Sequence, residues 1–331
     1  MEYLTISDTD IRASRIGLGT WAIGGWMWGG EKKNKPIETI HSALDRGINL
    51  VDTAPVYGQG RSEELVGEAL ESYGKRDEVV LATKLGLNWD GPNEVFRDCR
   101  PERLRQELED SLKRLRTDYI DIYQVHWPDP RQPFEQTARL MQDFLDEGKI
   151  RAIGVSNYSP EQMDAFRGAA PLHVEQPPFN LFERGIEEDV LPYCIEHDIT
   201  TLTYGALCRG LLSGKFDRDA DFEGDDLRQN DPKFADGERF AQYLDAVDQL
   251  DSYARDTYGK RVIHLAVRWL LDRPGVGVAL WGARVPSQLD AIEDVFGWEL
   301  GDDDFAAIDA ILDECIDDPV GPEFMAPPAR G

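Results

Sequence analysis

The sequence predicts a single-domain α/β protein folded as a (β/α)8 barrel of the TIM type, and three observations support this class. Short apolar segments with strand character alternate with amphipathic segments of helical period, and eight strand–helix units follow one another. No linker rich in Gly, Ser or Pro interrupts this alternation. A chain of 331 residues can bury the core of one barrel of this size.

The expected elements follow one another in regular order. An N-terminal hairpin, residues 1–14, turns at polar residues 8–10. The helix at 101–115 is the clearest of the series, because its leucines recur at helical spacing. Strands are predicted at residues 15–21, 48–51, 78–83, 119–125, 150–155, 173–176, 200–203 and 276–280. Helices are predicted from Pro36 and at 62–72, 101–115, 134–147, 160–168, 186–197, 238–258, 262–272 and 286–295.

Residues 1–331 are expected to form one domain with two additions besides the hairpin. An insertion after the seventh strand, residues 208–258, begins with a polar, acid-rich stretch, and a C-terminal helix and tail occupy 300–331. A Rossmann fold is the alternative, because Gly17, Gly19 and Ala22 fit the spacing of a dinucleotide-binding loop. That loop must open a helix at its last small residue. No helix is expected here before Pro36, so the match is interpreted as chance.

The charge balance excludes several classes of partner. The chain has 63 acidic and 36 basic residues, a net charge of −27, so nucleic acids and anionic membranes would be repelled. The sequence has no apolar run of about 20 residues and no signal-peptide layout, which predicts a cytoplasmic protein. Such an acidic surface suits a saline, halophilic cytoplasm. An ordinary acidic enzyme is the equal alternative.

Cysteine and histidine usage predicts no metal site. The cysteines, Cys99, Cys194, Cys208 and Cys315, are scattered and are interpreted as free thiols of a reducing compartment. The five histidines show no metal-ligand spacing.

Four reactive side chains fall at or near the ends of successive predicted strands. Asp52 ends the second strand, Tyr57 lies in the loop that follows, and Lys84 and His126 follow the third and fourth strands. The C-terminal strand ends of a barrel share one rim, so these side chains are expected to converge. Each has a structural explanation by itself, such as a turn or a packed core residue. Their occurrence at consecutive rim positions favours a functional site.

This set suits carbonyl reduction. An adjacent ammonium would favour the phenolate of a tyrosine and ease its proton donation, and a carboxylate would hold that ammonium in place. A neutral imidazole can orient the carbonyl oxygen. None of these groups can supply a hydride, so a nicotinamide cofactor is implied.

The spaced motifs resemble the aldo-keto reductase superfamily over about residues 3–313, and most resemble its bacterial general-stress and inositol-cluster branch. The motifs are Gly17-Leu-Gly-Thr-Trp21, Val51-Asp-Thr-Ala-Pro-Val-Tyr-Gly58, Thr83-Lys84, Val125-His126, Gly154-Val-Ser-Asn157 and Gln176. The resemblance implies that Tyr57 is the general acid, that Asp52 and Lys84 tune it, and that His126 orients the substrate.

The resemblance also implies the cofactor contacts. Ser156, Asn157 and Gln176 match positions that bind the nicotinamide carboxamide, and Tyr204 matches the aromatic residue that stacks on its ring. The pyrophosphate is expected at residues 205–215, with Arg209 or Lys215 as counter-charge. Arg284 would suit a 2′-phosphate, which favours NADP(H) over NAD(H). The complete expected set is Thr20, Trp21, Ser156, Asn157, Gln176, Tyr204, Gly205, Leu207, Arg209, Gly210, Lys215, Gly282, Arg284 and Gln288.

The chain departs from the family pattern at the nucleotide site. Gly205 stands where many members carry Ser, so one pyrophosphate hydrogen bond is in doubt. Ala291 and Ile292 replace a Glu-Asn pair that often binds adenine.

Tryptophans are expected to form the substrate pocket. Five of them lie in loops of the predicted catalytic rim, namely Trp21, Trp26, Trp28, Trp89 and Trp127. Such a pocket suits aldehydes with an apolar body, although part of the set would serve only to pack the loops.

The sequence therefore predicts an NADPH-dependent aldehyde or ketone reductase whose partner is a small carbonyl substrate and which acts as a monomer. Two alternatives stay open. One is a cofactor-binding regulatory subunit similar to potassium-channel β subunits. The other is a Schiff-base aldolase with Lys84 as its nucleophile.

Overall fold

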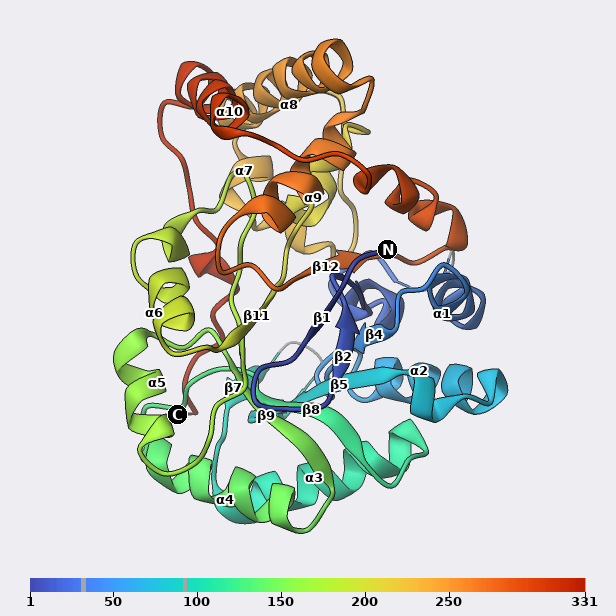
Figure 1. Cartoon of the computed structure of the whole chain (residues 1–331), viewed down its shortest axis with the longest axis vertical. Helices are drawn as coiled ribbons and strands as arrows, with labels where there is room; N and C mark the ends of the chain where they lie inside the picture. The colour runs from blue at the N-terminus through green and yellow to red at the C-terminus, as the bar shows by residue number, and fades with distance from the viewer. Residues whose placement is uncertain (31–33, 92–93, 331) are drawn as a thin grey trace.

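A closed barrel of parallel strands forms the centre of the protein, as predicted. The computed structural model describes residues 1–30, 34–91 and 94–330. Within them, eight strands close in the order β3-β4-β5-β8-β9-β10-β11-β12. The barrel closes where β12 pairs with β3, with Trp281 opposite Leu18. Helices surround the strands (Figure 1), so the connections are the crossovers that parallel pairing requires.

The strand bounds agree with the predicted strands to within a few residues. The two-stranded hairpin is β1 (Tyr3–Thr5) and β2 (Arg12–Ser14), and the barrel strands are β3 (Ile16–Gly19), β4 (Leu50–Asp52), β5 (Val80–Leu85), β8 (Ile120–Val125), β9 (Ile150–Ser156), β10 (Val174–Gln176), β11 (Thr200–Thr203) and β12 (Val278–Gly282). Lys84 thus lies inside β5 rather than after it.

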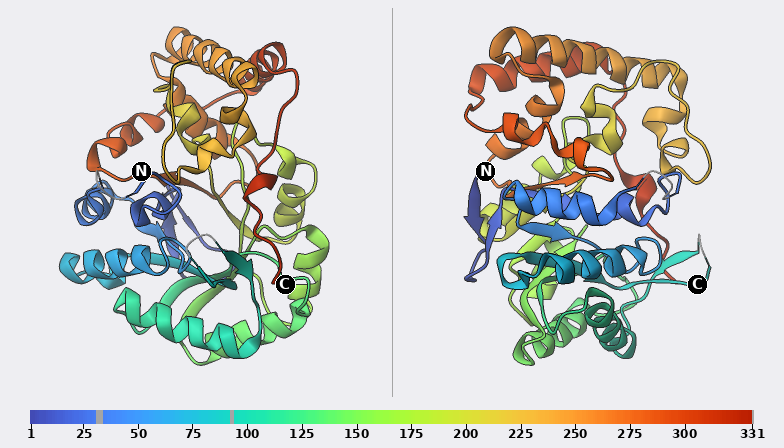
Figure 2. Two further views of the ribbon diagram at one scale, coloured as in Figure 1. Left: turned by 180° about the vertical axis from the view of Figure 1, so that it is seen from behind. Right: turned by 90° about the vertical axis from the view of Figure 1, so that its right-hand side faces the viewer.

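The helices begin and end where the sequence supplies suitable residues. Proline occupies the first turn of α1, α3 and α5, and Ser159 forms a capping box with Gln162 at the start of α5. The helices are α1 (Pro36–Asp45), α2 (Arg61–Tyr73), α3 (Pro101–Leu115), α4 (Phe134–Asp146), α5 (Pro160–Arg167), α6 (Val190–Glu196), α7 (Pro232–Ala235), α8 (Gly237–Tyr258), α9 (Val262–Asp272) and α10 (Asp302–Cys315). Helices α8 and α10 form an outer layer next to α9 (Figures 1 and 2).

Two predicted helices are wrong in type or length. The segment 286–295 forms two 3-10 turns, η6 (Pro286–Leu289) and η7 (Ile292–Val295), instead of an α-helix. Leu289, Ile292 and Val295 are its buried residues. Their three-residue spacing matches the 3-10 period and leaves one continuous buried face. The segment 186–197 likewise divides into η3 (Gly185–Glu187) and a shorter α6.

An unpredicted hairpin stands above the C-terminal end of β5. Strands β6 (Leu87–Trp89) and β7 (Val95–Arg97) pair in antiparallel fashion. The C-terminal tail lies alongside β7, where Arg97 N–H donates to Pro328 O at 3.0 Å and Arg97 bridges to Ala329. The end of the chain therefore meets this hairpin, as the side view shows (Figure 2).

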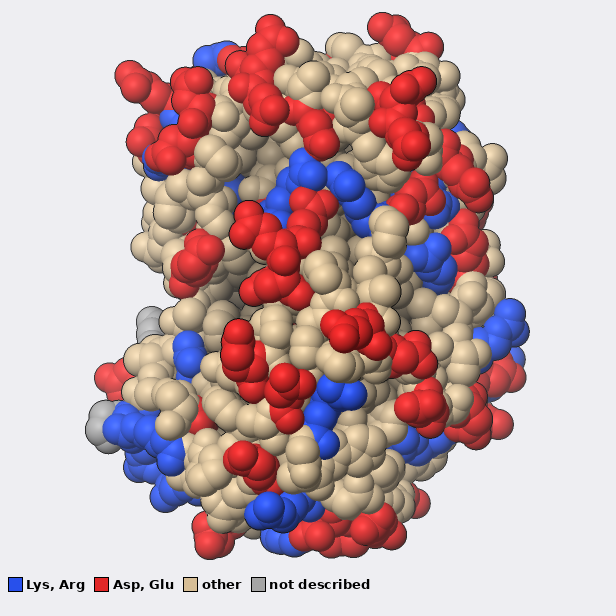
Figure 3. All heavy atoms as spheres, turned by 60° about the vertical axis from the view of Figure 1, so that its left-hand side comes forward, with Lys and Arg blue, Asp and Glu red and all other residues tan. Residues whose placement is uncertain are grey.

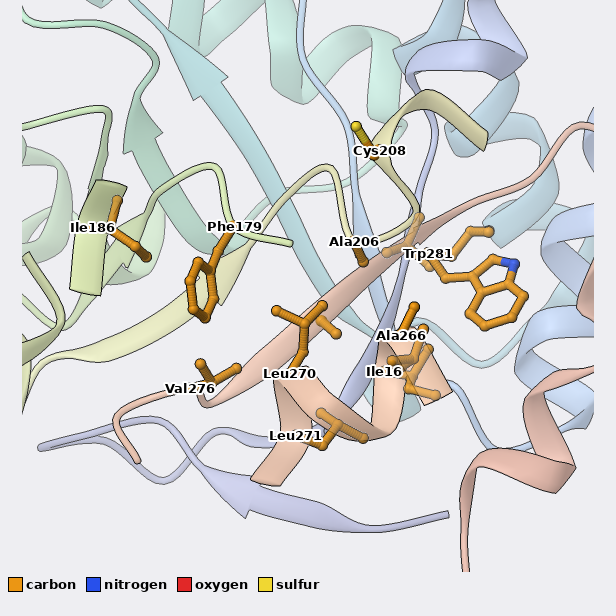
Figure 4. Close-up of a cluster of buried hydrophobic side chains, with 14 of the residues drawn as sticks. Ile16, Phe179, Ile186, Ala206, Cys208, Ala266, Leu270, Leu271, Val276 and Trp281 are labelled. Atoms are coloured by element: carbon orange, nitrogen blue, oxygen red, sulfur yellow. The ribbon is translucent and has the colours of Figure 1, made fainter. Parts of the chain in front are cut away.

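The hydrophobic core has two layers. Inside the barrel, the inward side chains of the strands form one cluster, which Ile6, Ile11 and Ala13 of the N-terminal hairpin complete. The hairpin thus closes the bottom of the barrel. A larger cluster lies between strands and helices; Figure 4 shows Ala266 and Leu270 of α9 beside Ile16 and Trp281 of the strands. Among the described residues, no helix is long and apolar enough to cross a membrane.

Candidate active site

A buried ion pair joins the ends of β4 and β5. Lys84 Nζ donates to Asp52 Oδ1 at 2.6 Å and to the backbone oxygen of Thr53 at 2.9 Å. Its third donor meets Tyr57 Oη at 3.4 Å. Both charged residues are almost fully buried. The parallel strands β4 and β5 place Asp52 and Lys84 near adjacent strand ends. The structure thus brings Asp52, Lys84 and Tyr57 together, as the sequence predicts.

Two glutamines complete the shell of the carboxylate. Gln176 Nε2 donates to Asp52 Oδ2 at 2.8 Å and to Gln124 Oε1 at 3.1 Å, and Gln124 Nε2 reaches the same Asp52 oxygen at 3.3 Å. The amide of Gln176, predicted to bind a nicotinamide carboxamide, therefore faces the carboxylate. Gln124 was not predicted. Its position at the end of the fourth barrel strand, two residues before His126, is the signal that could have identified it.

Burial dominates the electrostatics of the pair. Desolvation lowers the pKa of the Lys84 ammonium, although Asp52 acts in the opposite direction. Desolvation, with the charge of Asp52 as a second cause, raises the pKa of Tyr57 well above its usual value. Burial therefore outweighs the stabilisation that Lys84 can give to a Tyr57 phenolate, and the pKa of the tyrosine rises. In addition, Asp52 contacts Lys84 at 2.6 Å, closer than Tyr57 does, and compensates the charge of the ammonium.

His126 stands on the other side of the tyrosine. Its ring meets that of Tyr57 edge-on, with centroids 5.7 Å apart. Desolvation, followed by the charge of Lys84, lowers the pKa of His126 well below its usual value. A neutral imidazole at this position can donate one hydrogen bond without carrying charge.

Asn157 connects three strands at the rim. Its Nδ2 donates to His126 O at 3.0 Å and to Ser156 Oγ at 2.9 Å, and Tyr204 Oη donates to its Oδ1 at 2.8 Å. Ser156 Oγ in turn donates to the backbone oxygen of Gln176 at 2.7 Å. Asn157 adopts φ 63°, a conformation that Asn tolerates better than most residues. These predicted cofactor residues thus form one hydrogen-bonded group next to His126.

The loop after β3 covers the same rim. The Trp21 ring stacks on the Tyr57 ring at 5.7 Å and 17°, and the Trp28 ring meets Trp21 edge-on at 5.7 Å. Thr20 is fully buried and its Oγ1 donates to the backbone oxygen of Asp52 at 2.9 Å. Thr20 therefore fixes the loop to β4.

Three cations gather at the ends of β11 and β12. Partial burial and the charges of Arg228 and Arg284 lower the pKa of Lys215 to about 8, although Lys215 keeps a large exposed fraction. Asp226 pairs with Arg228. In the described residues, neither Lys215 nor Arg284 has a carboxylate within 4.0 Å. The group therefore carries excess positive charge in a chain of net −27, which suits a bound anion.

The sequence reasoning missed Arg228, because it lies in the acid-rich insertion among polar residues that are expected to be exposed. The structure buries it, with its guanidinium 4.4 Å from the Phe222 ring and 5.4 Å from the Trp28 ring. Arg284 Nη1 donates to Trp28 O at 2.9 Å. Trp28 thus lies between the cations and the catalytic rim. A space-filling view of one face of the molecule shows acidic side chains spread widely over its surface (Figure 3), in line with the net charge of −27.

Arg209 does not share the excess positive charge of these cations. It pairs with Glu183 and with Asp231 inside the protein, where Lys233 also binds Glu183 at 2.8 Å. Its charge is therefore compensated, so the predicted role of Arg209 as a pyrophosphate counter-charge lacks support. Arg209 itself has φ 53°, a strained conformation that these ion pairs hold.

The remaining predicted cofactor residues line the same side of the barrel. Gln288 Oε1 accepts the Arg284 N–H at 2.7 Å and fixes the turn into η6. Gly282 ends β12 and is exposed. Gly205 and Gly210 have φ 75° and 92°, and Leu207 N-caps the 3-10 segment η4 (Cys208–Ser213). Backbone N–H groups can approach an anion closely at such glycines.

The other predicted pocket tryptophans surround the proposed proton donor. Trp26, Trp89 and Trp127 pack in one small cluster with Tyr57. The Arg97 guanidinium lies 5.1 Å from the Trp127 ring and its Nε donates to Pro327 O at 2.8 Å. The hairpin β6-β7 and the tail thus contact this tryptophan cluster, an arrangement that sequence reasoning missed. The described residues hold no group of three His, Cys, Asp or Glu that could bind a metal ion.

The barrel and this rim define the class of protein. Residues 15–313 match the aldo/keto reductase family, and the chain belongs to it. It is therefore an oxidoreductase, and members of this family bind nicotinamide cofactors. The residues present fit such a cofactor, because excess positive charge and the hydrogen-bonded group of Asn157 and Tyr204 both follow the C-terminal ends of barrel strands.

Several known proteins are similar over nearly the whole chain. Aldo-keto reductase YhdN of Bacillus subtilis is 62% identical over 330 residues, which cover 100% of this chain and 99% of that protein. The NADH-specific methylglyoxal reductase of Escherichia coli is 35% identical over 303 residues, which cover 87% of this chain and 91% of that protein. The structure of glycerol dehydrogenase AKR11B4 from Gluconobacter oxydans is 54% identical, covers 98% of this chain and 99% of its own, and has a TM-score of 0.88.

A relative named as a channel subunit is less similar in sequence than these proteins. A probable voltage-gated potassium channel β subunit of Arabidopsis thaliana is 30% identical over 300 residues, which cover 87% of this chain and 89% of that protein.

Proposed function

We propose that this protein reduces aldehydes or ketones to alcohols with NADPH, and that Tyr57 is the general acid. The observation that carries the proposal is the buried chain from Asp52 through Lys84 to Tyr57, with neutral His126 beside it. Bound dihydronicotinamide would supply the hydride to the carbonyl carbon. The substrate is a small carbonyl compound of the cytoplasm.

Tyr57, Lys84 and His126 control the transfer of a proton to the carbonyl oxygen. The high pKa of Tyr57 keeps its hydroxyl protonated when the substrate binds. Tyr57 Oη then donates its proton to the carbonyl oxygen as negative charge develops there. The Lys84 ammonium, 3.4 Å away, stabilises the phenolate that remains. His126 donates a hydrogen bond to the same carbonyl oxygen and orients it.

Lys84 is poorly suited to Schiff-base chemistry. Its three ammonium protons meet Asp52, Thr53 O and Tyr57. A nucleophilic amine needs a free lone pair directed at the substrate. The geometry therefore favours a role in tuning Tyr57 over that of an aldolase nucleophile.

The cations at β11 and β12 support NADP(H) as the cofactor. Arg284 offers a charged donor fork that suits a phosphate, and Lys215 and Arg228 lie near it. The name of the Escherichia coli relative describes an NADH-specific enzyme. The excess positive charge here is the reason to propose a preference for the phosphorylated cofactor.

The test is the Tyr57→Phe variant. It removes the proton donor and keeps the ring that stacks on Trp21. We expect NADPH binding within about threefold of wild type and a loss of about 10²- to 10⁴-fold in kcat with a reactive aromatic aldehyde. Cofactor titration by fluorescence, with NADPH and NADH in parallel, and steady-state kinetics give both values.

Tyr73→Phe is a matched control, because Tyr73 lies on α2 and its hydroxyl donates to Asp45 at 3.3 Å. The Tyr73→Phe variant should retain the NADPH affinity and the kcat of the wild-type protein. Undiminished aldehyde reduction by the Tyr57→Phe variant would refute the proposal.

A further inference from the structure

Behind the hydrogen-bonded group of Asn157 lies a buried carboxyl group that the proposed reaction does not use. Glu175 lies in β10 and is fully buried. Its Oε2 atom lacks a hydrogen-bond partner within residues 1–30, 34–91 and 94–330. Buried polar atoms are nearly always paired and a buried carboxyl group is costly, so Glu175 calls for an explanation.

Glu175 and its two neighbours in β10 face opposite sides of the strand. Val174 belongs to the apolar cluster inside the barrel, and Gln176 reaches Asp52. Because side chains alternate along a strand, Glu175 points away from the barrel interior, toward the helix layer, where its charge acts on Cys194 of α6. The strand itself therefore separates this carboxyl group from the reacting atoms.

Glu175 contacts the turn between β9 and α5. Its Oε1 accepts the backbone N–H of Tyr158 at 3.3 Å, and the backbone N–H of Asn157 also acts on this carboxyl group. Asn157 has φ 63°, an uncommon conformation that its surroundings must hold. On the far side of the turn, Tyr158 is buried and meets Phe134 and Phe166 edge-on. Glu175 thus supports the backbone of the turn from beneath.

The same turn carries polar side chains to the rim. Asn157 bonds through its side chain to His126 O, Ser156 Oγ and Tyr204 Oη at 3.0, 2.9 and 2.8 Å. A displacement of the Asn157 backbone would change all three contacts at once. Support of this backbone by Glu175 therefore decides how the rim presents its amide and hydroxyl groups.

Glu175 gives the turn a hydrogen-bond acceptor more than a charge. Burial raises the pKa of Glu175 well above its usual value, and the N–H groups of Tyr158 and Asn157 act against this rise. The neutral acid is therefore favoured, and an amide of the same shape offers the same acceptor. Glutamine is thus the conservative replacement, whereas leucine fills the buried space and removes the acceptor.

We propose that Glu175 is a positioning residue for the nicotinamide end of the cofactor, because its buried carboxyl oxygen holds the turn that presents Ser156 and Asn157 at the rim. This inference rests on the proposed reductase function and on the predicted nicotinamide contacts of Ser156 and Asn157. Loss of Glu175 should weaken the contacts of the nicotinamide ring and leave those of the phosphates unchanged.

The experiment compares the cofactor with and without its nicotinamide ring. NADP⁺ carries the ring, and 2′-phospho-ADP-ribose is the same nucleotide without it. Calorimetry gives both Kd values, and steady-state kinetics at saturating NADPH give kcat with a reactive aromatic aldehyde. For Glu175→Leu we expect the Kd for NADP⁺ to rise about tenfold, kcat to fall about tenfold, and the Kd for 2′-phospho-ADP-ribose to stay within about twofold. Glu175→Gln should keep all three values within about threefold.

Ser14→Ala is the matched control. Ser14 is buried in β2 at the bottom of the barrel, and its Oγ accepts the Asn49 N–H at 3.1 Å. This variant also removes a buried acceptor of a backbone N–H, but far from the rim. It should lower the thermal stability and leave kcat and the ratio of the two Kd values unchanged.

Three results would overturn the inference. Equal weakening of both nucleotides by Glu175→Leu would show that the residue serves only the fold. Unchanged NADP⁺ binding and kcat in that variant would show that the turn needs no support. A Glu175→Gln variant as impaired as Glu175→Leu would also overturn it, because the amide keeps the acceptor.

Hydrogen exchange on the wild-type protein covers the case in which Glu175→Leu does not fold. In protein labelled with ¹⁵N-tyrosine, NADP⁺ should slow exchange of the Tyr158 amide about tenfold relative to the Tyr243 amide of α8, and 2′-phospho-ADP-ribose should not. Equal slowing by both nucleotides, or slowing by neither, would overturn the inference.

Failure of the proposed function is a separate outcome. If the wild-type protein reduces no carbonyl compound, the proposed function is wrong, and the two titrations still test Glu175. If it binds NAD⁺ more tightly than NADP⁺, the proposed cofactor preference is wrong, and the same comparison is made with NAD⁺ and ADP-ribose.

Discussion

Two regions of the molecule are built in different ways: the catalytic rim with Asp52 and Lys84, and the cation group of Lys215, Arg228 and Arg284 at the ends of β11 and β12. Asp52 and Lys84 lie in regular strands, fully buried, and contact each other at 2.6 Å. Lys215 and Arg228 lie in the irregular insertion, and Arg284 lies in the turn before η6. The first group compensates its own charge, whereas the second carries an excess of positive charge. Strands thus give the rim fixed geometry, and loops give the cation group unsatisfied charge for an anionic ligand.

The largest effect should follow from removing the Lys84 ammonium from the catalytic rim. In Lys84→Met, no cation stabilises the Tyr57 phenolate, so we expect kcat to fall by about 10²- to 10⁴-fold while the Kd for NADPH changes by less than about threefold. Single-turnover kinetics and cofactor titration measure the two quantities. If kcat falls less than threefold, the rim does not perform the proton transfer.

This variant leaves Asp52 without its buried partner, which is strongly destabilising. The double variant Asp52→Asn/Lys84→Met removes both charges and is expected to fold with the same loss of kcat. Lys75→Met, at an exposed lysine after α2, is the control and should retain wild-type rates.

A smaller effect, and one on binding alone, is expected for the cation group. Arg284→Gln removes a charged donor from the proposed 2′-phosphate site, so the Kd for NADPH should rise by about ten- to a hundredfold. The Kd for NADH and the kcat at saturating NADPH should stay within about twofold. Fluorescence titration with both cofactors gives the comparison.

Arg218→Gln removes an exposed arginine of the same insertion, paired with Asp245, and should leave both affinities unchanged. Equal weakening of NADPH and NADH by Arg284→Gln would contradict the assignment of Arg284 to the extra phosphate.

The smallest effect should appear in the pH dependence. The pKa of Lys215 is about 8 without ligand, so Lys215 is charged below that pH and neutral above it. Affinity for NADPH should therefore be fully present below pH 8 and fall, by up to about tenfold per pH unit, as pH rises above 8. Binding near pH 8 should also take up a proton, because a phosphate stabilises the ammonium form.

Titrations from pH 6.5 to 10 and calorimetry in buffers of different ionisation enthalpy test this dependence. Lys215→Arg should flatten the profile, since a guanidinium stays charged over the whole range. A wild-type Kd that is constant from pH 7 to 10 would show that Lys215 takes no part.

The residues of the rim could be predicted because each follows or ends a strand that the sequence marks clearly. Gln124 was not predicted because a glutamine near the end of an apolar strand belongs to no motif, and only its position two residues before His126 indicates a role. The charge compensation of Arg209 could not be foreseen because its partners Glu183 and Asp231 lie 26 and 22 positions away in separate loops. Arg228 and the tail beside β7 were missed for the same reason: their contacts join segments that local patterns cannot connect.

By itself, the sequence determined the barrel, the order of its strands and the positions of the four proposed catalytic residues at or near the strand ends. Alternation of strand and helix periods, proline at helix starts and the end of each apolar run are local signals, and parallel pairing then brings the strand ends together. Only the tertiary structure decided the burial that raises the pKa of Tyr57, the compensation of Arg209 by Glu183 and Asp231, and the excess charge around Lys215. These properties depend on burial and on partners distant in sequence, which the local pattern of residues does not contain.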